Sequence, residues 1–339
     1  MKKTLIIFLA LVVVLMSKAS GDLPLKLIAT TPLPGFEGDL EFFAADVKGN
    51  RLFLCAENHK TVEVFNLQTG KRIRSIGGFG VPHDILFLPD SNSLIVTDGG
   101  EGFGWVELVS VENYKIVDKI KLPSDVDEAV YNPINKYFYV QSGGEETGGK
   151  THLLNIIDTS NFKLVGSITL PGNHSNAMAT DHSGTRLYVN LTSIDEVGVV
   201  DLETRQLIAR WPVPEAHHPN SIAIDEVNHR LFTATHQPAK FFVFDTVSGK
   251  VVATLPCTGL NDHMTFDAAR RRIYVTGTET ASVFEQRDAD HYEHIADVPT
   301  GYRAKTSLFV PELNRLYVAL SGKERPGAKL AVHIYQVQP

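Results

Sequence analysis

The stretch Asn314-Arg315-Leu316-Tyr317-Val318 is one of seven copies of a phrase in which a polar turn and a basic or polar residue precede an apolar strand. The other copies are Asn50-Arg51-Leu52-Phe53-Leu54, Asn92-Ser93-Leu94-Ile95-Val96, Asn135-Lys136-Tyr137-Phe138-Tyr139, Thr185-Arg186-Leu187-Tyr188-Val189, His229-Arg230-Leu231-Phe232 and Arg271-Arg272-Ile273-Tyr274-Val275. Their first apolar residues stand at positions 52, 94, 137, 187, 231, 273 and 316, which are 42 to 50 residues apart. Repeats of this length, rich in β-branched and aromatic residues, predict four short strands each.

The unit around residue 231 shows how the four strands divide. A small apolar strand (residues 220–225) precedes the phrase, and a third strand (241–245) ends in an acid. The turn Ser248-Gly249-Lys250 then leads to a fourth strand (251–255), and glycine there suits a left-handed hairpin residue. Seven such units predict an all-β fold, a seven-bladed β-propeller with four antiparallel strands per blade.

The last unit stops after its third strand, at residues 330–337. We expect residues 25–33 to supply its missing outer strand, because this pairing joins the two ends of the chain and covers their edges. The sequence therefore predicts one propeller domain over residues 20–339, which we expect to be a monomer.

A signal peptide is predicted over residues 1–19. Lys2 and Lys3 precede an apolar run at residues 5–16, and the small residues Ser17 and Ala19 suit cleavage after Ala19. Twelve apolar residues are too few to cross a hydrocarbon core of about 30 Å. We therefore expect a periplasmic or secreted protein that has no membrane span after cleavage.

Composition excludes several classes of function. The 32 basic and 39 acidic residues give a formal charge of −7, so the chain lacks the basic surface typical of nucleic-acid binding. Two cysteines exclude a disulfide scaffold and multi-cysteine metal sites. The sequence also contains no Gly-x-Ser-x-Gly nucleophile motif.

Two copies of the strand phrase carry a family resemblance. Tyr274-Val275-Thr276-Gly277 and Ile95-Val96-Thr97-Asp98 resemble the repeat of the YVTN-repeat propellers, the YncE-like proteins, and residues 244–250 are similar to that family's third-strand phrase. The resemblance implies an exported seven-bladed propeller. It implies no reaction, because propellers carry many unrelated functions.

Polar residues recur eleven positions before the first apolar residue of each phrase. The first hairpin of blade three is one residue shorter than the others, so its corresponding residue is Asp127 and not Val126. The seven residues are Glu41, His83, Asp127, Asn176, Asn220, Asp262 and Lys305. We expect them to gather at one mouth of the central channel, because the first strand of each blade lines it. Neighbouring positions and loops complete the predicted ligand-binding set: Asp39, Asp127, His174, His218, His236, His59, Arg303 and Lys305. A polar rim that only satisfies turn backbones is the simpler alternative.

Two metal hypotheses also fit these residues. Oxygen ligands from Glu41, Asn176, Asn220 and Asp262 suit calcium. This set resembles the metal site of gluconolactonase-like and paraoxonase-like lactonases, which implies a hydrolase with His83 or His263 as the base. A ring of histidines, loosely similar to the propeller of nitrous oxide reductase, suits copper or zinc. It comprises His83, His174, His218 and His263, with His59 and His236 from loops.

The sequence thus favours a propeller that binds a small molecule or a protein partner at its channel mouth, without a defined reaction. A calcium-dependent lactonase or esterase is the first alternative, and a histidine-bound copper or zinc protein is the second.

Overall fold

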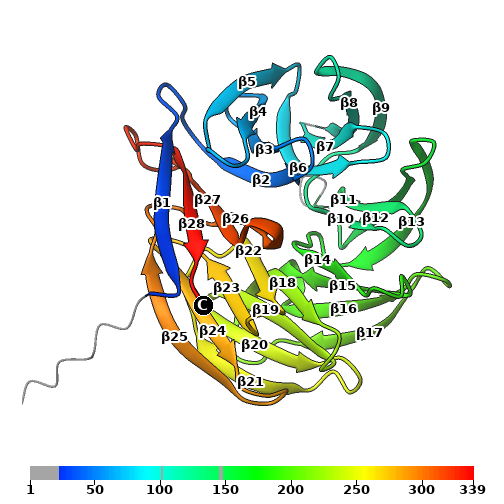
Figure 1. The fold of residues 1–339 in the computed structure, drawn as a ribbon. Helices are drawn as coiled ribbons and strands as arrows, with labels where there is room; N and C mark the ends of the chain where they lie inside the picture. Colours follow the sequence, from blue (N-terminus) through cyan, green and yellow to red (C-terminus); the bar gives the residue numbers. More distant parts are fainter. Residues whose placement is uncertain (1–22, 101, 145–147) are drawn as a thin grey trace, which may run out of the picture.

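Seven four-stranded antiparallel sheets form a ring in the described part of the chain (Figure 1). The structure is a computed structural model, and it describes residues 23–100, 102–144 and 148–339. The prediction of an all-β, seven-bladed β-propeller is confirmed. Short 3₁₀ turns at Thr192–Ile194 and Pro311–Leu313 are the helical elements within the described ranges.

Each blade is built from strands in sequence order, with one exception in the last. Blade one comprises β2 (Leu40–Asp46), β3 (Arg51–Ala56), β4 (Thr61–Asn66) and β5 (Arg72–Gly77), and blade two comprises β6 (Val81–Leu88), β7 (Ser93–Gly99), β8 (Phe103–Ser110) and β9 (Lys115–Pro123). Blade three comprises β10 (Ala129–Asn132), β11 (Tyr137–Ser142), β12 (Thr151–Asp158) and β13 (Lys163–Pro171), and blade four comprises β14 (Met178–Thr180), β15 (Arg186–Leu191), β16 (Glu196–Asp201) and β17 (Gln206–Pro212). Blade five comprises β18 (His217–Asp225), β19 (Arg230–Gln237), β20 (Lys240–Asp245) and β21 (Val251–Pro256), and blade six comprises β22 (His263–Asp267), β23 (Arg272–Thr276), β24 (Thr280–Gln286) and β25 (Tyr292–Pro299). Blade seven comprises β26 (Thr306–Val310), β27 (Arg315–Leu320), β28 (Ala331–Val337) and, from the start of the chain, β1 (Leu25–Pro32).

The repeated phrase is explained by the hairpin that joins the first and second strands of a blade. In six of the seven blades the residue directly before the second strand has a left-handed backbone, with φ of 56° at Asn50, 49° at Asn92 and 50° at Asn314. Asparagine tolerates this conformation better than most residues. In blade five the turn between the third and fourth strands uses glycine in the same way, since φ is 69° at Gly249.

The ring closes through the two ends of the described chain. β1 pairs antiparallel with β28, with Leu25 opposite Val337 and Pro32 opposite Ala331. In Figure 1 these two strands, blue and red, lie side by side. The predicted outer strand at residues 25–33 is therefore confirmed to within one residue, and blade seven gains a fourth strand that covers the edge of β28.

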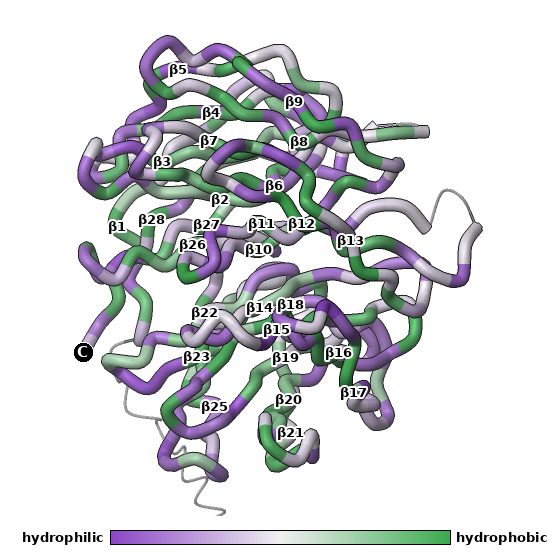
Figure 2. The backbone as a smooth tube through the Cα atoms, turned by 90° about the vertical axis from the view of Figure 1, so that its right-hand side faces the viewer, coloured by the Kyte–Doolittle hydropathy of each residue, from purple (hydrophilic) through white to green (hydrophobic). Residues whose placement is uncertain are grey.

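The core is divided among the interfaces between blades. Seven apolar clusters of described residues each join two neighbouring blades around the ring. Phe241 of blade five, for example, stacks on Phe284 of blade six with ring centroids 4.4 Å apart. In the side view of Figure 2 hydrophobic stretches alternate with hydrophilic ones along the tube. Packing between blades therefore fixes the first strands around a common axis.

Three further observations concern the ends and the cysteines. The predicted signal peptide at residues 1–19 lies outside the described residues. Within the described ranges, no helix has the length and apolarity of a membrane span. Cys55 is buried, and both it and Cys257 are free thiols.

Candidate functional site

A cavity of about 230 Å³ lies where the first strands of the blades converge. Every blade contributes to its wall, because each first strand begins beside the axis. The lining residues are Phe42, His83, Asp127, Glu128, Asn176, Asn220, His236, Asp262 and Lys305. We call the seven residues that the sequence aligns about eleven positions before each phrase's first apolar residue the column. The structure brings most of them together around this cavity. In blade three Asp127 faces the cavity, whereas Val126 is buried away from it.

Lys305 is the centre of the charged network. Its Nζ lies 2.9 Å from Glu41 Oε2 and 2.7 Å from Asp262 Oδ2, and all but a small part of the side chain is buried. Burial favours the neutral amine, but the carboxylates of Asp262 and Glu41 outweigh this effect and raise the pKa of Lys305 well above its ordinary value. An ammonium ion therefore lies between two of the predicted calcium ligands.

The other two predicted calcium ligands extend this network as amides. Asn220 Nδ2 donates to Asp262 Oδ1 at 2.7 Å, and Asn176 Nδ2 donates to Asn220 Oδ1. The four residues therefore do lie close together, and each is bonded to another member of the set or to Lys305. Their role as metal ligands stays a prediction.

His83 continues the network on the other side of Glu41. Its Nδ1 contacts the Asp127 carboxylate, and its Nε2 lies 3.8 Å from Glu41 Oε2. Burial favours the neutral ring, but Asp127 and Glu41 raise the pKa of His83 to about 10. His83 is therefore protonated at neutral pH, whereas a general base must be deprotonated to accept a proton.

Charge alternates around five consecutive blades. Around the ring, blades six, seven, one, two and three contribute an acid, a base, an acid, a base and an acid in turn. These residues are Asp262, Lys305, Glu41, His83 and Asp127. The amides of blades four and five carry no charge. This order places every base between two acids, so that the buried charges compensate one another.

Glu128 and His263 have unusual surroundings. Glu128 lines the cavity, and its Oε2 is buried without a hydrogen-bond partner in the described part of the chain. Burial, reinforced by Asp127 and Asp262, raises the pKa of Glu128 well above its ordinary value. His263 packs edge-to-face on Phe42 with ring centroids 4.6 Å apart, and burial lowers its pKa to about 4.

Glu128 and Phe42 were not predicted from the sequence, although they directly follow Asp127 and Glu41. The repeat spacing gives one residue per blade, whereas at the start of a first strand two successive side chains can reach the cavity. An acid directly after a column position was the available signal.

Three residues of the predicted ligand-binding set lie near the cavity but outside its wall. Arg303 Nη2 lies 3.1 Å from Asp39 Oδ2, and both side chains are buried. His174 Nε2 lies 3.0 Å from Asn176 Oδ1. The wall residue His236 makes a similar contact, since its Nε2 lies 3.6 Å from Asp262 Oδ1.

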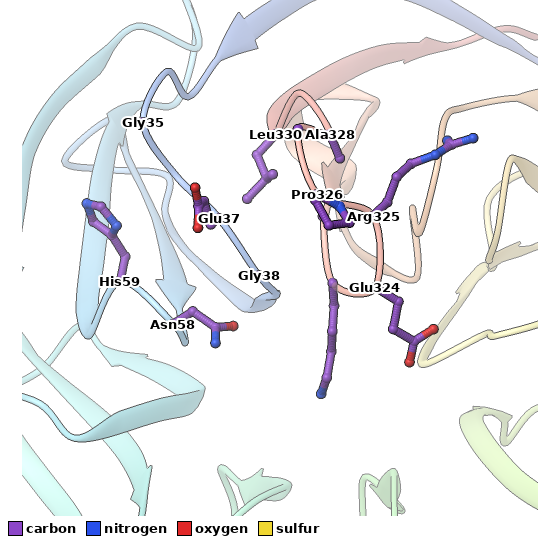
Figure 3. Close-up of a pocket in the computed structure, with 13 residues that line it drawn as sticks. Gly35, Glu37, Gly38, Asn58, His59, Glu324, Arg325, Pro326, Ala328 and Leu330 are labelled. Atoms are coloured by element: carbon purple, nitrogen blue, oxygen red, sulfur yellow. The ribbon is translucent and has the colours of Figure 1, made fainter.

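His218 and His59 lie elsewhere. His218 is exposed at the start of β18, where its backbone N–H donates to Asp195. His59 lines a larger hollow of about 770 Å³ and stacks on Phe36 with ring centroids 3.8 Å apart. Figure 3 shows His59 and Glu37 on one side of this hollow, with residues of the β27–β28 loop on the other. Two of the six histidines considered for copper or zinc therefore lie away from the axial cavity.

The comparison with curated proteins supports the family resemblance. The uncharacterized protein YncE of Escherichia coli K12 is 28% identical to this chain over 109 residues, which are 31% of this chain and 30% of YncE. The YncE protein of Escherichia coli O157:H7 matches over the same length with the same identity. The chain is a YncE-like seven-bladed β-propeller. The match spans less than a third of the length of these curated relatives. No family model matches the chain.

Solved structures share the architecture of this YncE-like propeller. A chain of Kuenenia stuttgartiensis hydrazine synthase aligns with a TM-score of 0.72 and 16% identity over 85% of this chain and 96% of that one. A chain of a mitotic checkpoint complex aligns with a TM-score of 0.76 and 14% identity over 100% of this chain and 99% of that one. At such low identity the likeness concerns the fold.

Proposed function

We propose that this propeller is exported and binds a small molecule with a positively charged group in its axial cavity, without catalysing a reaction. Export rests on the pattern of residues 1–19, which has the basic start, short apolar run and small residues of a signal peptide. The volume of about 230 Å³ lies below the 300–1,000 Å³ common for drug-sized ligands, which favours a small solute.

The Glu128 carboxyl group carries this proposal. A buried oxygen atom without a hydrogen-bond partner costs about 1–3 kcal/mol, so a ligand that supplies a donor there gains this energy on binding. The cavity wall also holds three acids, Asp127, Glu128 and Asp262, against two cations, Lys305 and His83, and a bound cation would stabilise the charged form of Glu128, whose pKa burial raises. An ammonium or guanidinium group on the ligand complements both features.

The calcium-dependent lactonase remains the alternative from the sequence. A calcium ion bound by both Glu41 and Asp262 would have to lie where the Lys305 ammonium lies, between the two carboxylates at 2.9 and 2.7 Å. The same buried network therefore favours ligand binding over calcium chemistry.

The test compares small solutes of matched length and opposite charge. Titration calorimetry and thermal unfolding are measured with butylamine, 1,4-diaminobutane, butyrate and succinate, and with calcium as a separate arm. We expect the amines to bind and to raise the unfolding temperature, and Glu128→Gln to weaken their binding at least tenfold. Glu112→Gln is the control, because Glu112 is exposed between β8 and β9.

Two results would overturn the proposal. One is equal binding of the carboxylates and the amines, and the other is unchanged amine affinity in the Glu128 variant. Calcium binding accompanied by turnover of lactones or esters would transfer support to the hydrolase.

A further inference from the structure

A second group of ligating side chains lies between blades one and two, beside the axial cavity. Glu41 belongs to β2, Glu57 to the turn between β3 and β4, and His83 to β6. One ligand atom from each lies within 4.8 Å of the other two. In the described ranges no other group of at least three histidine, cysteine, aspartate or glutamate side chains meets this distance.

We propose that Glu41, Glu57 and His83 bind one divalent transition-metal ion, of which Zn²⁺ is the probe, and that Asp127 orients His83 for this purpose. The inference goes beyond the proposed function and does not depend on it, because the metal would be bound by the protein without any organic ligand.

The contact between Asp127 and His83 is the first argument. Histidines that bind metals commonly donate their other ring N–H to a carboxylate, which fixes the ring and its tautomer. Here Asp127 contacts Nδ1, and Nε2 is the nitrogen that faces Glu41. The ring is therefore already held with one nitrogen toward the cluster, and a metal ion would displace the Nε2 proton to solvent.

Spacing within the charge network is the second argument. Lys305 lies 2.9 Å from Glu41 and 2.7 Å from Asp262, whereas His83 Nε2 and Glu41 Oε2 are 3.8 Å apart. The link between blades one and two is therefore the widest of these three, and Glu57 adds a further carboxylate beside it. A carboxylate offers about four lone-pair sites, so Glu41 can hold Lys305 and a metal ion together.

Charge and ligand type select the class of metal. Two carboxylates neutralise a divalent cation, and one imidazole favours zinc and related transition metals over calcium, which prefers oxygen ligands. Bonds of about 2.0–2.1 Å in a tetrahedral site would bring the ligand atoms to about 3.3 Å from one another. Glu57 is half-buried in a turn, so its side chain can rotate to bring its carboxylate closer to the other two ligand atoms.

The test uses the mature propeller after dialysis against a chelator. Titration calorimetry with zinc chloride is expected to show one site per chain, and Glu57→Gln is expected to weaken zinc binding at least tenfold. Glu279→Gln is the matched control, because Glu279 is exposed in the corresponding turn of blade six, between β23 and β24. The control is expected to bind zinc as the unchanged protein does.

A spectroscopic readout separates this site from adventitious binding. Cobalt(II) added to the chelated protein is expected to give visible absorption bands typical of nitrogen and oxygen ligation, which His83→Gln abolishes while the circular dichroism spectrum stays β-type. The proposal is overturned if the unchanged protein binds no zinc or cobalt, or if Glu57→Gln retains full affinity. Neither result bears on amine binding at Glu128, so the two proposals can fail separately.

Discussion

Replacing Lys305 by methionine tests whether the buried charges hold the first strands together. The ammonium contacts both oxygens of Glu41, at 3.1 and 2.9 Å, and also Asp262. Methionine fills most of the volume but leaves Glu41 buried without its cation. Breaking a buried ion pair by removing one partner costs about 3–5 kcal/mol, so we expect about 4 kcal/mol of lost stability.

The assay is urea unfolding followed by circular dichroism and tryptophan fluorescence at neutral pH. With an unfolding entropy of about 2.1 cal/mol/K per residue over roughly 310 residues, the same loss lowers the melting temperature by about 6 °C. Lys323→Met is the control, because Lys323 is half-exposed at 3.5 Å from Asp39, and exposed pairs contribute about 0–1 kcal/mol. A loss below about 1 kcal/mol for Lys305→Met, or one no larger than the control's, would refute the reasoning.

Three further predictions concern turns, a bond between blades and pH. Gly249→Ala is expected to lower the free energy of unfolding in urea by about 2–4 kcal/mol, because φ is 69° and a Cβ would lie 2.2 Å from Trp211 Nε1. Gly35→Ala is the control, because φ is 81° but the space around it is open, and it should lower the free energy of unfolding by about 1 kcal/mol. Tyr317→Phe should cost about 1–2 kcal/mol, because the hydroxyl of Tyr317 donates to a buried backbone carbonyl of blade one at 2.6 Å, and an unchanged urea midpoint would contradict this. Burial lowers the pKa of His152 below 6.5, so the unfolded chain binds its proton first and this contribution to stability is lost as pH falls from 6.5 through the folded-state pKa. His152→Gln should therefore flatten the stability profile below pH 6.5, and identical profiles for the two proteins would contradict the assignment.

Most of the fold was predictable because each repeat contains its own local signals. A left-handed residue directly before the second strand, such as Asn50 or Asn314, recurs in six of the seven blades, and the turn before the fourth strand has a left-handed residue in blades one to five, which is glycine in blades one and five. The closing strand was predictable because the last unit lacked a fourth strand and residues 25–33 had none to pair with. Both inferences needed only sequence spacing and the requirement that strand edges be covered.

The residues of the site were predictable as a column, but their partners were not. Spacing placed Glu41, Asp262 and Lys305 in one layer, yet it could not show that the ammonium lies between the two carboxylates. That depends on side-chain rotamers and on the order of blades around the axis. Glu57 escaped notice because it comes from a turn outside the column and approaches His83 only through packing between blades one and two.

The alternation of charge around the axis is the common basis of the two proposals, a small cationic ligand and a metal ion at one mouth. Lys305 and His83 each lie between two acids, so the five charged residues from blade six to blade three already balance to within one charge. Glu128 and Glu57 do not belong to this series of five, so neither acid is paired with one of its two bases. A cation beside such an acid stabilises its charged form, because the low dielectric of the interior strengthens the attraction between the two. The two surplus acids lie on different blades, and this separation is why we assign one to an organic cation in the cavity and the other to a metal ion beside it.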